Sequence, residues 1–325
     1  MRLFFQLIRL TFLCCLVLGS SSASAEFLRL ALQIGEGDQA LHGSLLMPMH
    51  KQKPPVVLIV AGSGATDRNG NSVGLPGKNN SLKMLAEELA IAGIASLRFD
   101  KRGVGESRMA GLSENDLRFQ TYVADVESWL KLLIADERFS GVAVIGHSEG
   151  STLGMLAAQK LAVKAYVSLA GPGQSAAKII RAQLAGKLPP QLAEVSEDIL
   201  TQLEKNKPVN EVPTPLLNLY RPSVQGYLMS WFPVVPSDEI RRLSMPVAIF
   251  QGDTDIQVGV SEAQLLAKAQ PKAELHIVRG MNHILKQVPA DMQEQVASYS
   301  NPDLPLDPVF VTPLVQFLKK SFAAK

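Results

Sequence analysis

A serine flanked by glycines is the residue of this chain whose surroundings most suggest chemistry. Ser148 lies in GHSEG (146–150), directly after the apolar run GVAVI and directly before STLGMLAAQK, a run rich in small residues. A strand, a Gly-x-Ser-x-Gly turn and a helix form a nucleophile elbow, in which the turn is so tight that its flanking positions must be glycine. The same five residues without that context would indicate only a structural turn. The context favours Ser148 as a nucleophile.

A serine nucleophile needs a base, and the base needs a carboxylate that orients it. After an elbow these groups follow in the order serine, acid, histidine, each on a loop behind a later strand. The segment AIFQGDTDIQV offers two acids, Asp253 and Asp255. The Gly-x-x-Asp spacing from Gly252 carries Asp255 beyond the turn, so we predict that Asp255 is the acid. Asp253 is then expected to cap that turn.

The predicted base is His283, one of five histidines in the chain. It follows the strand-like segment AELHIV in a loop that contains a glycine, where it can reach the carboxyl edge of a sheet. His276 lies inside that segment and is expected to be a packed or surface residue of the strand. His147 would have to point away from its neighbour Ser148, and we interpret it as a packing residue.

Two backbone N–H groups are expected to form an oxyanion hole. One belongs to Glu149, the residue after the nucleophile, at the start of the following helix. The other is expected in the loop AGSGATDRNGN, where small residues allow the backbone to approach a substrate oxygen closely. Ser63 is the predicted donor in that loop, and Gly64 remains an alternative.

Alternating strand and helix patterns surround these residues. Two strands, FLRLALQI and ALHGSLLMP, precede a regular alternation of apolar strands and amphipathic helices. Apolar rather than alternating strands indicate a mostly parallel sheet that helices cover on both faces. The alternation stops at residues 172–243, where helical patterns and a proline-rich tract appear, and it resumes at MPVAIFQGDTD. We predict that 172–243 is a helical cap inserted into one domain, 26–325.

The first 25 residues read as a secretory signal peptide. Arg2 and Arg9 precede or flank apolar runs, and Ala23-Ser24-Ala25 provides a small-residue cleavage site before Glu26. The apolar run is short for a bilayer span, so stable membrane insertion after cleavage is not expected. The sequence therefore predicts an exported protein, periplasmic or secreted.

Composition excludes several other classes of function. Cleavage before Glu26 removes two arginines and no acid, so the formal net charge of +2 becomes zero, and both cysteines leave with the signal. A neutral chain gives no electrostatic reason to bind nucleic acid. The scattered histidines show no metal-ligand spacing, and serine chemistry needs no cofactor, so neither a metal nor a cofactor is expected.

The chain resembles the α/β-hydrolase superfamily, in particular the bacterial esterases and S33-like serine aminopeptidases. The matching motifs are VAGSGATDRNGN (60–71), LRFDKRGVGES (97–107), IGHSEGS (145–151), FQGDTDIQV (250–258) and GMNHIL (280–285). The resemblance implies a triad of Ser148, Asp255 and His283. It also implies backbone oxyanion donors at Ser63 and Glu149. The chain departs from many relatives at Ala61, where they have histidine.

The resemblance implies that the charged loop DKRGVGES and the segment TDRNGN form a structural network near the site. Asp100 and Arg102 are accordingly expected to make ion pairs rather than to contact substrate.

These features together predict an exported serine hydrolase that cleaves small-molecule carboxylic esters through an acyl-enzyme. An aminopeptidase would need a carboxylate patch in the cap, and EVSEDILTQLE offers acids whose spacing also fits a solvated helix face. A thioesterase would use the same machinery. A non-catalytic ligand-binding protein of the same fold is the alternative from another class, and the sequence leaves the oligomeric state open. The apolar segment GYLMSWFPVV predicts small or medium acyl groups rather than charged ones.

Overall fold

The structure is a computed structural model that describes residues 27–49, 52–74, 76–108 and 113–324. The predicted signal peptide lies outside the described residues. Within them, no helix is long and apolar enough to cross a membrane.

The described residues form one eight-stranded sheet in the order β1-β2-β4-β3-β5-β6-β7-β8. The strands are β1 (Phe27–Ile34), β2 (Leu41–Pro48), β3 (Val56–Val60), β4 (Ala95–Phe99), β5 (Val142–His147), β6 (Ala165–Leu169), β7 (Val247–Gly252) and β8 (Glu274–Val278). β2 pairs antiparallel with β1 and β4, and all pairs from β4 to β8 are parallel. Every residue of β3 to β7 is buried, which explains their mainly apolar character.

Helices follow most of the parallel strands. They are α1 (Ser81–Ile91), α2 (Phe119–Ala135), α3 (Glu149–Ala158), α4 (Ala176–Leu184), α5 (Pro190–Glu204), α6 (Leu217–Tyr220), α7 (Pro222–Trp231), α8 (Pro236–Ile240), α9 (Val260–Ala269), α10 (Met292–Ser298) and α11 (Pro308–Ala323), with short 3₁₀ turns at Gly37–Gln39, Gly105–Ser107, Glu114–Asp116 and Thr214–Leu216.

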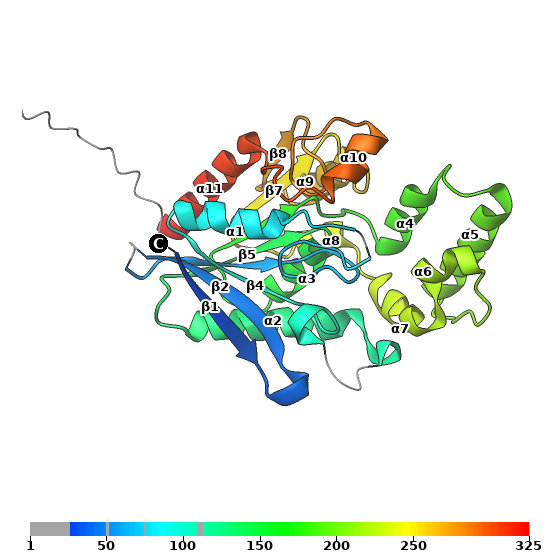
Figure 1. The fold of residues 1–325 in the computed structure, drawn as a ribbon, viewed down its shortest axis with the longest axis horizontal. Helices are drawn as coiled ribbons and strands as arrows, with labels where there is room; N and C mark the ends of the chain where they lie inside the picture. Colours follow the sequence, from blue (N-terminus) through cyan, green and yellow to red (C-terminus); the bar gives the residue numbers. More distant parts are fainter. Residues whose placement is uncertain (1–26, 50–51, 75, 109–112, 325) are drawn as a thin grey trace, which may run out of the picture.

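Two apolar cores lie on opposite faces of the sheet. α1 and α11 cover one face, where Leu85 and Phe317 pack on residues such as Ile145. α2, α3 and α9 cover the other face, with Trp129 and Leu266 in its core. Figure 1 shows α1 and α11 on the side of the sheet opposite α2. The predicted fold class, a mostly parallel sheet flanked by helices, is confirmed.

Five helices, α4 to α8, occupy the interval between β6 and β7. In Figure 1, α4 to α7 form a layer of their own beyond one end of the sheet, at the right of the picture. α7 joins this layer to the main domain, because Trp231 stacks on Phe119 of α2 with ring centroids 5.3 Å apart. The sequence patterns had indicated helices close to α4 and α5. They did not delimit the shorter helices α6 to α8, of which α7 and α8 begin at prolines.

Candidate active site

The turn between β5 and α3 holds Ser148 in a strained conformation. Ser148 has φ 54° and ψ −123°, a region that residues with a side chain rarely adopt. A Cβ added at Gly146 would lie 2.3 Å from the carbonyl oxygen of Gly150, and one added at Gly150 would lie 2.3 Å from that of Val60. Both flanking positions therefore require glycine, as an elbow does.

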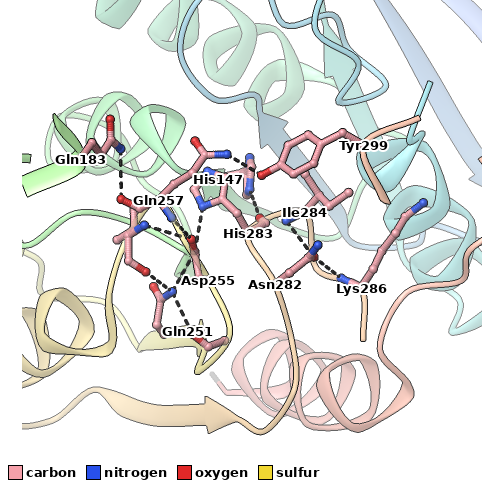
Figure 2. Close-up of polar contacts among 12 residues, drawn as sticks. His147, Gln183, Gln251, Asp255, Gln257, Asn282, His283, Ile284, Lys286 and Tyr299 are labelled. Atoms are coloured by element: carbon pink, nitrogen blue, oxygen red, sulfur yellow. Dashed lines mark hydrogen bonds and ion pairs between the residues drawn. The ribbon is translucent and has the colours of Figure 1, made fainter. Parts of the chain in front are cut away.

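Asp255 and His283 are hydrogen-bonded behind the ends of β7 and β8. His283 Nδ1 lies 2.8 Å from Asp255 Oδ2 (Figure 2). Three further donors hold the carboxylate: Gln251 Nε2 at 2.9 Å, and the N–H groups of Gln257 at 2.8 Å and Val258 at 2.9 Å. Burial opposes ionisation of Asp255, but His283 and the backbone N–H groups of Val258 and Gln257 outweigh it, so the pKa of Asp255 lies below its usual value.

The bond to Asp255 determines which nitrogen of His283 can act as a base. An ionised carboxylate only accepts hydrogen bonds, so Nδ1 carries the proton. Nε2 is then unprotonated in the neutral ring and can accept a proton from a nucleophile.

His147 connects the turn that holds Ser148 to the loop after β8 that holds His283. Its Nε2 donates a hydrogen bond to the carbonyl oxygen of His283 over 2.7 Å, and the two rings have centroids 4.9 Å apart (Figure 2). Burial, with a smaller contribution from His283, lowers the pKa of His147 to about 4, so this imidazole is neutral at pH 7. Ser148, the neighbour of His147, makes no hydrogen bond to His283 among the described residues. In this structure Asp255 is hydrogen-bonded directly to His283. Ser148 is linked to that pair through its chain neighbour His147, whose side chain donates to the His283 carbonyl oxygen.

The other candidate residues have structural partners. His276 stacks on Phe250 at 4.5 Å, as expected for a packed strand residue. Asp253 does not cap its own turn, and that prediction is wrong. Its carboxylate accepts the N–H of Gly280, 2.6 Å away, because β7 and β8 are neighbours and their following loops meet. The carboxylate that caps the turn after β7 is that of Asp255 itself.

The predicted oxyanion donors lie around one cavity. Glu149 is the first residue of α3, and N–H groups in the first turn of a helix have no partner within it. Ser63, Gly64, Ser148 and Glu149 all line a cavity of about 520 Å³.

The cap supplies much of the apolar wall of this cavity. Its apolar lining residues from α4 to α7 are Ala176, Ile179, Ile180, Leu219, Val224, Tyr227, Leu228 and Trp231. The segment GYLMSWFPVV, noted in the sequence for its apolar character, thus contributes Tyr227, Leu228 and Trp231.

Each carboxylate that lines the cavity among the described residues has a cationic partner. Glu114 accepts hydrogen bonds from both ends of the Arg221 guanidinium, with Nε at 2.8 Å. Glu149 pairs with Lys101 at 2.9 Å. The sequence reasoning missed Lys101 and Tyr227, although Lys101 lies in the charged motif DKRGVGES.

That motif otherwise forms the expected ion pairs. Asp100 accepts from Arg68 of the TDRNGN segment at 2.6 Å, and Arg102 bonds Asp125 at 2.7 Å. Arg102 and Lys101 also line the cavity.

The cap acids offered as an amine site lie elsewhere. Glu197 and Glu204 pair with Arg181 at 2.8 and 2.7 Å, and neither lines the cavity. Across the part of the chain that the structure describes, no group of three or more histidine, cysteine, aspartate or glutamate side chains could hold a metal ion.

The chain is similar in sequence to known hydrolases. Residues 74–226 match the family model of serine aminopeptidase, S33. Esterase EstD of Thermotoga maritima is 26% identical over 249 residues, which are 75% of this chain. That alignment spans 58% of EstD, so the chain matches less than two thirds of this relative.

Solved structures share the fold at low sequence identity. Est1E of Butyrivibrio proteoclasticus, solved with ferulic acid bound, superposes with a TM-score of 0.62 at 20% identity, over 90% of this chain and 100% of that one. The proline iminopeptidase of Mycobacterium smegmatis gives a TM-score of 0.57 at 15% identity, over 90% and 99% of the two chains.

Proposed function

We propose that this chain, which belongs to the α/β-hydrolase superfamily, is a serine esterase that cleaves neutral carboxylic esters through an acyl-enzyme on Ser148. The observation that carries the proposal is the strained Ser148 on the wall of a cavity with a largely apolar cap side, together with the hydrogen bond between Asp255 and His283 on the loops after β7 and β8. The names of EstD and Est1E support ester bonds as the target.

In the proposed reaction each of these residues acts once while the acyl-enzyme forms and once while it is hydrolysed. Ser148 Oγ attacks the ester carbonyl while His283 Nε2 takes its proton, and Asp255 stabilises the imidazolium that forms. The N–H groups of Glu149 and Ser63 donate to the oxyanion of the tetrahedral intermediate. His283 then returns the proton to the departing alcohol. A water molecule releases the acyl group by the same steps.

The charges of the cavity favour an ester over a peptide with a free amine. An aminopeptidase needs a carboxylate that binds the substrate ammonium group. Glu114 and Glu149 are the carboxylates available on the described wall, and each is bonded to a cation, Arg221 and Lys101 respectively. Thioesters present the same carbonyl chemistry without an ammonium group, so they belong in the same test.

The test is hydrolysis of p-nitrophenyl acetate and butyrate by the purified protein and by Ser148→Ala. We expect turnover in the parent and a loss of at least about a thousandfold in the variant, because the remaining catalysis comes from binding and the oxyanion hole. An alanine amide and an acyl thioester, assayed beside the esters, should be poor and good substrates respectively. Equal rates in parent and variant would rule out Ser148 as the nucleophile.

Export is a second part of the proposal, and it depends on the sequence of residues 1–25. Mass spectrometry of the protein recovered from the periplasm or medium should find Glu26 at its N-terminus. An intact Met1 in a cytoplasmic fraction would contradict this part and leave the chemistry untouched.

A further inference from the structure

A buried lysine contacts both backbone segments that carry the proposed oxyanion donors. Lys101 follows β4 and is 2% exposed. Its Nζ donates to the carbonyl oxygen of Gly62 at 2.5 Å and to Glu149 Oε2 at 2.9 Å. One ammonium group thus joins the loop after β3 to the first residue of α3.

The bond to Gly62 controls the direction of the Ser63 N–H. The carbonyl of Gly62 and the N–H of Ser63 belong to one peptide unit, which is planar, so in the trans form the two groups point in opposite directions. Glycine at position 62 leaves the backbone freedom to rotate this unit. A charge-assisted hydrogen bond on the carbonyl removes that freedom, because rotation would break it. Lys101 therefore holds the Ser63 N–H pointing away from itself.

The bond to Glu149 acts on the other donor. The carboxylate of Glu149 is held on one oxygen by Lys101 and on the other by the hydroxyl of Tyr227, which comes from cap helix α7. Burial and the adjacent carboxylate raise the pKa of Tyr227 well above its usual value, so the hydroxyl keeps its proton and donates. The side chain of Glu149 is thereby fixed at the residue whose N–H opens α3.

Stability alone gives a weak reason for such a group. The side chains of Lys101 and Glu149 are both 2% exposed, and the desolvation of a buried ion pair offsets most of its attraction. The ring of Tyr122 lies 5.4 Å from the ammonium group and covers another side of it.

We infer that Lys101 is a positioning residue for the oxyanion hole, which orients the Gly62–Ser63 peptide and the start of α3 so that two N–H groups converge on one point. Tyr227 extends this arrangement into the cap. The inference rests on the proposed function, because it assumes that these N–H groups stabilise an oxyanion.

The test replaces Lys101 together with its partners, because Lys101→Met alone would leave a buried carboxylate without a cation. The triple variant Lys101→Met/Glu149→Leu/Tyr227→Phe replaces the whole group by apolar side chains, an exchange that buried ion pairs tolerate. The control, Tyr227→Phe, keeps Lys101, its bond to Gly62 and its pairing with Glu149. Both keep the backbone of residue 149 and its N–H.

We expect the triple variant to lose about 100-fold in kcat on p-nitrophenyl butyrate, with KM within about threefold, since one oxyanion donor is typically worth that factor. Affinity for a trifluoromethyl ketone, whose adduct carries an oxyanion, should fall in parallel. The control should lose at least about tenfold less than the triple variant. If Lys101 only stabilised the fold, the triple variant would have a changed melting temperature, but it would not lose kcat selectively over KM.

A folded triple variant with parental kcat would overturn the inference, and so would equal losses in the triple variant and the control. Should the triple variant fail to fold, Lys101→Met/Glu149→Gln asks the same question, since the neutral amide leaves no buried charge unpaired and the backbone N–H of residue 149 is kept. Parental kcat in that variant would also overturn the inference. Failure of the proposed function itself would look different, with no Ser148-dependent hydrolysis in the parent protein.

Discussion

Hydrogen bonds to neighbouring strands hold the elbow residues in place. A non-glycine residue with the backbone angles of Ser148 costs about 1–3 kcal/mol. The Ser148 N–H donates to the carbonyl of Leu169 at 2.9 Å, and its own carbonyl accepts from Ser151 at 3.0 Å. These hydrogen bonds and the burial of the flanking residues offset the free energy of the strained backbone. In the loop after β7, each carboxylate oxygen of Asp255 accepts two hydrogen bonds. The orientation of this carboxylate toward His283 is therefore determined before any substrate arrives.

Because His147 is a buried residue with a lowered pKa, we expect the stability of the folded protein to depend on pH. Its pKa is about 4 in the folded protein and about 6.5 in an unfolded chain, so below pH 6.5 the unfolded state binds the additional proton. Stability from this group is therefore complete above pH 6.5 and is lost as the pH falls toward 4, by on the order of 3 kcal/mol. His147→Gln keeps an Nε2–H donor for His283 and removes the titration.

Urea unfolding between pH 4 and 7 measures this effect. The His147→Gln variant should show a smaller loss of unfolding free energy over that range than the parent. His276→Gln is the matched control and should retain the parental dependence, because it leaves His147 in place. Identical slopes for the parent and His147→Gln would exclude His147 as the source.

At the scale of elements, parallel strands bring the site together. Ser148 follows β5, Asp255 follows β7 and His283 follows β8, and the carboxyl ends of these parallel strands lie at one edge of the sheet. β5 can deliver its serine there only if α3 starts immediately and packs closely against β3. The absence of a side chain at Gly150 allows this contact.

Gly150→Ala should therefore be strongly destabilising. The new methyl group would lie 2.3 Å from the carbonyl oxygen of Val60 and 2.6 Å from that of Ala61, and this buried backbone at the end of β3 cannot move freely. We expect a loss of about 3 kcal/mol or more in unfolding free energy, and a loss of esterase activity as the elbow shifts. Gly74→Ala is the matched control, since its methyl group would meet no atom within 4 Å. Parental stability in Gly150→Ala would show that the elbow tolerates a side chain.

At the scale of the whole molecule, the cavity forms between the sheet edge and the cap. The core side provides the polar groups, including Ser148 and Lys101, while the cap side is largely apolar. The cap is attached through Tyr227 and through the stacking of Trp231 on Phe119. It also reaches the acid loop, because Gln183 of α4 donates to the carbonyl of Gln257 at 3.0 Å (Figure 2). Under the proposed function, we therefore expect the assembled cap to select the acyl chain.

Filling the cavity from the cap should shorten the acyl chains that the enzyme accepts. Ile179→Trp adds volume at the wall of α4, so kcat/KM for p-nitrophenyl hexanoate should fall about tenfold or more relative to the acetate. Val195→Trp places the same side chain on α5 at a position outside the cavity wall and should leave the ratio unchanged. If kcat/KM for the hexanoate relative to the acetate were the same in both variants, acyl groups would have to bind elsewhere.

Much of the fold was predictable because local sequence determines it. The buried strands β3 to β7 are mainly apolar, and α1, α2 and α9 carry amphipathic patterns, so their order along the chain indicated a parallel sheet. The elbow could be recognised because steric exclusion at Gly146 and Gly150 leaves a direct trace in the sequence. For the same reason the loops of Asp255 and His283 could be located from the strands before them. The roles of these residues remain predictions for the experiments above.

What the sequence did not determine depends on contacts between segments far apart in the chain. The partner of Asp253 is Gly280, the partner of Lys101 is Glu149, and Tyr227 reaches Glu149 from the cap. None of these pairs has a characteristic spacing, because strand order and the return of the cap over the sheet bring them together. The size and apolar character of the cavity follow from the same packing. The sequence by itself therefore determined the strands, the elbow and the order of the candidate residues, whereas the tertiary structure alone decided how the cap and the buried lysine surround them.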